Sequence, residues 1–181
     1  MIEIVHGDVL ATPAEAFILS IDGIKRGMEG NVARAYARRW PDAWMEIEDE
    51  IKYPVPLGRA IAIHPENESG FPLVLIASTL HHLDTLTDSQ KAGIVRSALS
   101  DSIQLAVRYR VRRVAVAAMT GGWRLDFPHA LAAMMEGLRP IAAYHHSLVV
   151  AIHLLTREHA RQAAEIAKSC GIDVCIGDSL K

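Results

Sequence analysis

One stretch of the sequence decides the class of fold: VAVAAMTGGWRLDFP, at residues 114–128. Its first five residues are apolar at every position, which is typical of a central strand covered on both faces by helices. A loop with two adjacent glycines follows, and Pro128 suits the first position of a helix. The stretch therefore predicts a strand, a loop and a helix of an α/β protein, in which ligands bind beyond the carboxyl ends of the strands.

Similar patterns occur along the rest of the chain. Apolar runs rich in β-branched residues predict further strands at residues 2–5, 16–21, 59–64, 73–79, 148–154 and 172–176. Helical spacing predicts one helix from Val32 to Pro41, which stops it, and a second after a capping box of Thr87 and Gln90. A third begins at Pro128, and a last one is capped by Thr156 and closed by Gly171.

Composition limits the class of protein. The chain has 181 residues, 50% of them hydrophobic and 22% charged, which indicates a single globular domain over residues 1–181. Nineteen Lys and Arg against 21 Asp and Glu give a net charge of −2, so generic binding to nucleic acid is not expected. Neither the first residues nor the apolar stretch at 140–156 has the pattern of a signal peptide or a membrane span. With Cys170 and Cys175 interpreted as thiols, we expect a cytoplasmic protein.

Three loops after predicted strands contain candidate ligand-binding residues. The first holds Gly27, Gly30, Asn31 and Val32, and the start of its helix would direct free N–H groups at a diphosphate; an ordinary turn explains the two glycines equally well. In the second loop, Thr120, Gly121, Gly122, Trp123 and Arg124 combine backbone amides, a ring and a guanidinium, although large aromatic residues more often pack in a core. In the third, Asp8 and Val9 follow the first strand, and Asp8 could accept a hydrogen bond from an amine or form a turn.

In their order, the three loops resemble the macro domain, a family of ADP-ribose-binding modules. The elements that match are Gly7-Asp8-Val9, the stretch from Arg26 to Pro41, and the loop from Met119 to Asp126. The resemblance covers residues 2 to about 139 and is nearest to the branch with ADP-ribose-ester and DNA ADP-ribose hydrolases. It implies a three-layer α/β/α fold with a mixed, mainly parallel sheet. It also implies an acid at Asp8 for the adenine amine and two glycine loops for the diphosphate.

The catalytic residues of that branch do not match this chain. Leu80 stands where the branch has a lysine, and Arg124 stands where it has an aspartate, with Asp126 two residues displaced. We therefore expect a domain that binds ADP-ribose, free or on a protein or nucleic acid, without a cofactor. The alternatives are an ADP-ribosyl hydrolase or an ADP-ribose-phosphate phosphatase that uses Asp126 or Asp22, and an interaction domain whose pocket is degenerate.

Nine histidines, including the pairs at 81–82 and 145–146, raise the question of a metal. Adjacent residues of a strand point to opposite faces, so a tandem pair does not supply two ligands to one ion. No metal site is predicted. His81 and His82 follow a predicted strand, and either of them could line a pocket at its carboxyl end.

Overall fold

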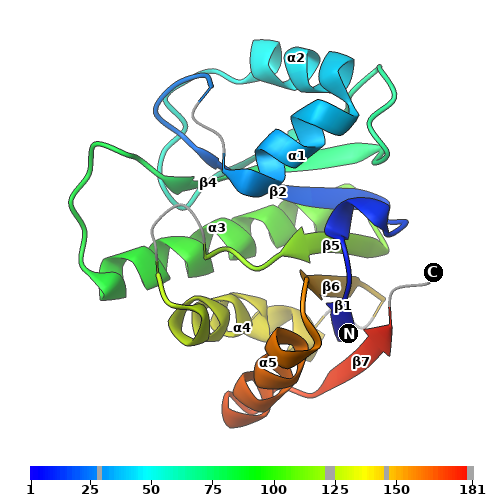
Figure 1. Ribbon diagram of the computed structural model, residues 1–181, viewed down its shortest axis with the longest axis vertical. Helices are drawn as coiled ribbons and strands as arrows, with labels where there is room; N and C mark the ends of the chain where they lie inside the picture. The colour runs from blue at the N-terminus through cyan, green and yellow to red at the C-terminus, as the bar shows by residue number, and fades with distance from the viewer. Residues whose placement is uncertain (28–29, 121–124, 145–146, 179–181) are drawn as a thin grey trace.

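The structure describes residues 1–27, 30–120, 125–144 and 147–178, and within them a seven-stranded sheet forms the centre of this computed structural model (Figure 1). Its order is β3-β4-β2-β5-β6-β1-β7. The strands are β1 Ile2–His6, β2 Ala16–Asp22, β3 Ala60–Ile63, β4 Leu73–Leu80, β5 Arg113–Ala117, β6 Val149–Leu154 and β7 Val174–Asp178. Neighbouring strands are parallel except β3 and β4, so the predicted mixed, mainly parallel sheet is confirmed.

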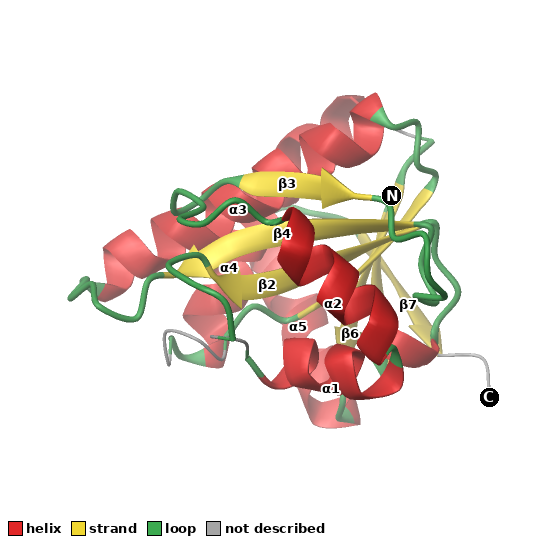
Figure 2. Ribbon diagram, turned by 90° about the horizontal axis from the view of Figure 1, so that it is seen from above, coloured by secondary structure: helices red, strands yellow, loops and turns green. Residues whose placement is uncertain are grey.

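Helices cover both faces of the sheet. They are α1 Asn31–Arg39, α2 Pro41–Glu50, α3 Asp88–Arg108, α4 Phe127–Tyr144 and α5 Arg157–Ser169, with a short 3-10 helix, η1, at Val9–Ala11. Figures 1 and 2 show α1 and α2 on the opposite side of the sheet from α3 and α4. The larger core lies under α3, α4 and α5, and a smaller core with stacked aromatic rings lies under α1 and α2. The three-layer α/β/α prediction is confirmed.

Pro41 lies between two helices, of which the sequence predicted only the first. The first helix does end before Pro41, at Arg39, but Pro41 then opens α2 instead of beginning a loop. Proline is suited to the first turn of a helix because its missing N–H would have no partner there. The apolar residues Ala43 and Ile47 are fully buried on the inner face of α2. The prediction that the first helix stops at Pro41 is confirmed. The sequence did not predict α2, because a proline that ends one helix can also begin the next.

The predicted caps of α3 and α5 are confirmed. Thr87 and Gln90 form both hydrogen bonds of a capping box at the start of α3. Thr156 Oγ1 accepts a hydrogen bond of 3.1 Å from the backbone N–H of His159 at the start of α5. Gly171 has a φ of +69° just after α5, a conformation that other residues adopt at a cost.

The parallel order brings the carboxyl ends of β1, β6, β5, β2 and β4 to one edge of the sheet. The loops that follow these strands include the segments in which the sequence placed ligand-binding residues. In the described part of the chain, no helix is long and apolar enough to cross a membrane.

Candidate functional site

A cavity of about 170 Å³ opens at this edge, between α1 and the ends of β1, β5 and β6. Its walls are formed after β1 by Gly7, Asp8, Val9 and Leu10, on α1 by Asn31, Val32 and Ala35, and at the ends of β5 and β6 by Ala117, His153 and Leu155. Most of these side chains are apolar, and the acidic and imidazole groups among them belong to Asp8 and His153. An apolar cavity with a few polar groups is the usual form of a small-molecule site.

The end of β1 places Asp8 at the mouth of the cavity. The backbone N–H of Gly7 donates a hydrogen bond of 2.9 Å to the carbonyl oxygen of Leu154, which ties β1 to the end of β6. Gly7 has a φ of +150°, which favours glycine. Oδ1 of Asp8 accepts a hydrogen bond of 3.0 Å from the Leu10 N–H, so Asp8 caps η1. The structure shows no described partner for Oδ2 of Asp8, which leaves this oxygen able to accept from a ligand.

The N-terminus of α1 lies against the same cavity. The first N–H groups of an α-helix have no acceptor within the helix. At α1 the cap residue is Gly30, no side chain among the described residues accepts from these groups, and the first turn contains no acidic residue. Arg34 donates a hydrogen bond of 2.8 Å to Oδ1 of Asn31, which keeps a positive charge beside this turn. The arrangement favours an anion at the mouth of the cavity.

His153 forms part of the cavity wall and is buried, with 3% of the residue exposed. Neither ring nitrogen has a hydrogen-bond partner among the described residues. The pKa of the ring is lowered to about 4, first by burial and then by the positive charge of Arg113, while Asp8, Glu3 and the Gly7 backbone act in the opposite direction. The Gly7 backbone raises the pKa of the ring from nearby, but its contact with the ring is not a well-formed hydrogen bond. His153 is therefore a neutral imidazole at neutral pH.

An acid–histidine pair lies further along the same edge, where β2 and β4 end. Asp22 is 2% exposed, and its carboxylate accepts hydrogen bonds from the backbone N–H groups of Ile24 and His82. It also lies 2.8 Å from Nδ1 of His82. When Nδ1 of His82 carries the proton, Nε2 carries the lone pair. The side chain of His82 is 27% exposed, so the ring is partly open to solvent. His81 is held differently, by a contact of 2.9 Å between its Nε2 and the Val55 carbonyl oxygen.

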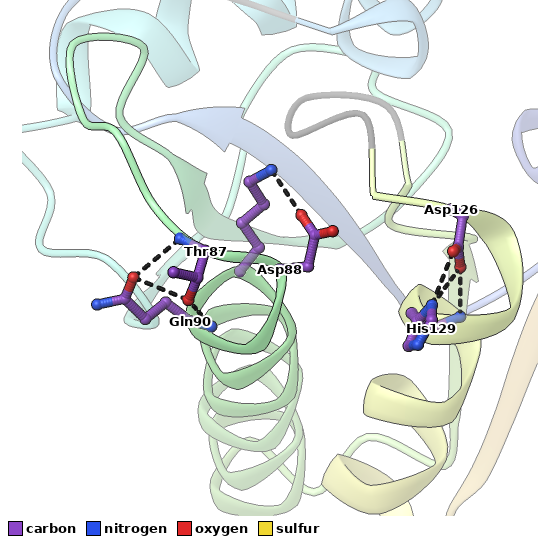
Figure 3. A network of polar contacts seen from close by, with 6 residues as sticks. Thr87, Asp88, Gln90, Asp126 and His129 are labelled. Carbon is purple, nitrogen blue, oxygen red and sulfur yellow. Dashed lines mark hydrogen bonds and ion pairs between the residues drawn. The ribbon is translucent and has the colours of Figure 1, made fainter.

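Asp126 caps α4. Its Oδ1 accepts from the backbone N–H of His129 at 2.9 Å, and both carboxylate oxygens lie 2.7 Å from Nδ1 of the same residue (Figure 3). These bonds hold the pKa of the Asp126 carboxyl below its ordinary value. Figure 3 also shows the Thr87–Gln90 capping box at the start of the neighbouring α3. The contacts of Asp126 are those of a helix cap, and the side chain is exposed.

The structure brings together only some of the residues that the sequence singled out. Asp8, Val9, Asn31 and Val32 line the cavity. Gly27 and Gly30 are exposed just before α1 and do not line it, Thr120 is half-buried in the loop after β5, and Asp22 and Asp126 lie away from the cavity wall. Gly121, Gly122, Trp123 and Arg124 lie outside the described residues.

Sequence reasoning missed the contribution of β6. His153 and Leu155 line the cavity, although no site residue was expected after residue 139. A histidine within the apolar run at 148–154 was the available signal, because an ionisable residue inside a buried strand is unusual. For metals, the described residues contain no group of three or more His, Cys, Asp or Glu that could hold an ion.

Comparison with solved structures identifies the fold. A macrodomain of Oceanobacillus iheyensis with ADPR aligns with a TM-score of 0.78 and 11% identity over 92% of this chain and 91% of that one. The macrodomain of Thermus aquaticus DarG aligns at 0.66 with 20% identity, over 85% and 98%. A Trypanosoma brucei macrodomain in complex with ADP aligns at 0.72 with 12% identity, over 91% and 67%. No family model and no curated protein matches the sequence. The chain has the macrodomain fold.

Proposed function

We propose that the cavity and the N-terminus of α1 together bind ADP-ribose, free or attached to a protein or nucleic acid. The observation that carries the proposal is the position of an apolar cavity, with Asp8 at its mouth, directly beside a helix N-terminus without a side-chain cap. The cavity suits a flat base with an amine, and the N-terminus of α1 suits a diphosphate. Two of the aligned macrodomains are in structures with ADPR or ADP, which supports the same ligand class.

The size of the cavity agrees with this division of the ligand. A site that encloses a whole drug-sized molecule has a volume of roughly 300–1,000 Å³. The cavity of about 170 Å³ is smaller and suits one ring system. The remainder of the ligand would lie along the edge of the sheet, over the first turn of α1 and toward the ends of β2 and β4.

Calorimetric titration with ADP-ribose tests the proposal, with AMP and ribose 5-phosphate as partial ligands. Micromolar binding, about −8 kcal/mol, is expected for ADP-ribose, with weaker binding of AMP and the weakest for ribose 5-phosphate. Asp8→Asn is the variant of choice, because the amide oxygen can still accept from Leu10 and preserve the cap while the negative charge is lost. Absence of any heat or thermal shift with ADP-ribose would favour the interaction-domain alternative.

The Asp22–His82 pair favours a second candidate function, hydrolysis of an ADP-ribosyl bond. A carboxylate that accepts from one imidazole nitrogen orients the ring, so that the other nitrogen can take a proton from water. Strands lie about 4.8 Å apart, so the β2–β4 boundary is roughly 10–14 Å from β6 along the edge. This span is comparable with the two riboses and diphosphate that separate the base of ADP-ribose from its far anomeric carbon.

Release of ADP-ribose from ester-linked and base-linked substrates tests this second candidate. His82→Gln and Asp22→Asn should both reduce the rate by a factor of 100 or more, the usual contribution of a general base. His64→Gln is the matched control, because His64 is exposed and its Nδ1 contacts the Pro72 carbonyl oxygen at the far end of β4. Equal rates in all four proteins would exclude the pair from catalysis, and binding without release would leave only the first function.

A further inference from the structure

The two helices that cover the smaller core carry charges of opposite sign. α1 contains Arg34, Arg38 and Arg39 and no acidic residue. α2 follows it directly and contains acidic residues but no basic one; the acidic residues are Asp42, Glu46, Glu48, Asp49 and Glu50. The neighbouring surfaces of α1 and α2 therefore form a basic half and an acidic half.

Both halves face solvent on the same side of the molecule. Each helix buries one side in the smaller core, where Tyr36 of α1 and Ile47 of α2 are fully buried. Figure 2 looks onto these helices, which lie in front of the sheet. Residues three and four apart lie side by side on a helix, so the exposed residues form one stripe on each helix. The exposed residues of this α1–α2 face are Arg34, Arg38 and Arg39 of α1 and Asp42, Met45, Asp49 and Glu50 of α2.

Several charges of the α1–α2 face have no counter-charge within the described chain. Asp49 pairs with Arg26. Arg38, Asp42 and Glu50 take part in none of the ion pairs between described residues. Glu50 is the last residue of α2, where the helix dipole disfavours a carboxylate, and the last turn has no basic residue to offset it. The stability of α2 alone does not explain this charge.

The arrangement of the charges restricts the kind of molecule that fits the α1–α2 face. A polyanion would be attracted by α1 but repelled by α2, and a basic peptide would be repelled by α1. A second copy of the chain, turned by a two-fold rotation, presents its α2 to α1 and its α1 to α2, so that both halves meet the opposite charge. Met45, which is 59% exposed on α2, adds a flexible apolar side chain to such a contact.

We propose that the α1–α2 face is an interface between two copies of this chain, with α1 of each copy against α2 of the other. Ion pairs between exposed side chains contribute little each and are screened by salt, so the dimer is weak and salt-sensitive. The inference goes beyond the proposed function and requires no ligand.

Sedimentation equilibrium of the full chain at a series of concentrations tests the proposal, with two charge-reversed variants. One variant carries Arg38→Glu and Arg39→Glu, and the other carries Asp42→Lys and Glu50→Lys. Each variant alone places like charges opposite each other, which should weaken self-association by about tenfold or more. An equimolar mixture of the two variants should associate as wild type does, because each then meets the opposite charge on the other.

A third variant, with Arg157→Glu and Arg161→Glu, is the matched control. Arg157 and Arg161 are exposed on α5, four residues apart, and α5 packs on the larger core at the opposite face of the sheet. This variant should associate as wild type does. Thermal unfolding of each variant shows whether it folds, and the salt dependence of wild-type association gives a test that needs no variant.

Wild type that is monomeric at every concentration in low salt would overturn the proposal, as would association that salt does not weaken. Unchanged association of both charge-reversed variants would do the same, and so would a mixture that fails to associate although both variants fold. Binding of a single-stranded oligonucleotide by monomeric wild type, lost in the Arg38→Glu and Arg39→Glu variant, would assign the face to a polyanion instead. Titration with ADP-ribose is independent of these results, so the proposed function stands or fails separately.

Discussion

The stability of the protein should depend on pH through His153. In the unfolded chain this ring takes up a proton near its ordinary pKa of 6.5, whereas in the folded protein burial delays protonation until about pH 4. Between these values the unfolded state binds more protons than the folded state. The free energy of unfolding therefore falls as the pH falls through this window, and it is unaffected by His153 above it.

The size of the effect follows from the two pKa values. Each factor of ten in proton affinity corresponds to about 1.4 kcal/mol. The interval from 6.5 to about 4 makes His153 responsible for a loss of about 3 kcal/mol once the pH is below both values. For a protein with a typical stability of about 5–15 kcal/mol, this is a large part of the total.

Urea denaturation at a series of pH values from 4 to 8 measures this loss, with wild type and His153→Leu compared at each pH. His153→Leu should be at least as stable as wild type at pH 7, because leucine replaces a polar ring without partners by an apolar group. Its advantage should grow as the pH is lowered toward 4. His64→Gln, the exposed control, should follow the wild-type pH dependence.

A constant difference between His153→Leu and wild type across this range would refute the reasoning. It would mean that the folded protein protonates His153 as easily as the unfolded chain does. The carboxylates of Asp8 and Glu3, which raise the pKa of the ring, would then outweigh burial and the positive charge of Arg113, which lower it. Direct titration of the His153 ring by NMR would identify this case by a pKa near 6.5.

Three further predictions test the fold. Thr87→Ala should lower the free energy of unfolding by about 1 kcal/mol, measured by urea denaturation, because it removes half of the capping box of α3. Gly70→Ala should lower the melting temperature more than Gly171→Ala does. Both glycines have a φ of +69°, but at Gly70 the new Cβ would lie 2.2 Å from the Trp40 ring, whereas at Gly171 it would face open space. Gly137→Ala should destabilise by about 1–3 kcal/mol in the same assay, since its Cβ would stand 2.7 Å from the backbone of α3.

Local patterns predicted most of the fold, because they decide local structure. The uninterrupted apolar run at 114–118 predicted a central strand, and Val114, Ala115 and Val116 are buried in β5. Caps such as Thr87 and Thr156 predicted where helices begin. Pro41 could not be interpreted in the same way, because a proline fits after one helix and at the first turn of another. The position of α2 depends on the apolar core that Ala43 and Ile47 enter, which is a tertiary effect.

The candidate site was predictable only where its residues follow a strand in a recognisable loop. Asp8, Val9, Asn31 and Val32 lie in such loops, and all four line the cavity. His153 is inside a strand more than 140 residues from Asp8 in the sequence, and the parallel pairing of β1 with β6 brings the two ends together. No local pattern contains that pairing, so the histidine inside the apolar run at 148–154 could mark residue 153 as unusual, but only the structure places it near Asp8.

The stability of the fold alone does not account for His153. Its neighbours in register, Val5 and Ala117, are apolar, and an apolar side chain at residue 153 would satisfy the same packing without an unpartnered donor and acceptor. The N-terminus of α1 repeats this feature, since it has neither a side-chain cap nor an acidic first turn, whereas α3 and α5 have both. Among the described residues, the His153 ring has no hydrogen-bond partner and α1 has no side-chain cap, and both lie beside the cavity. Stability is commonly lower where a site is preformed, and an uncapped helix N-terminus beside a cavity is a place where an anionic ligand could supply the missing acceptor.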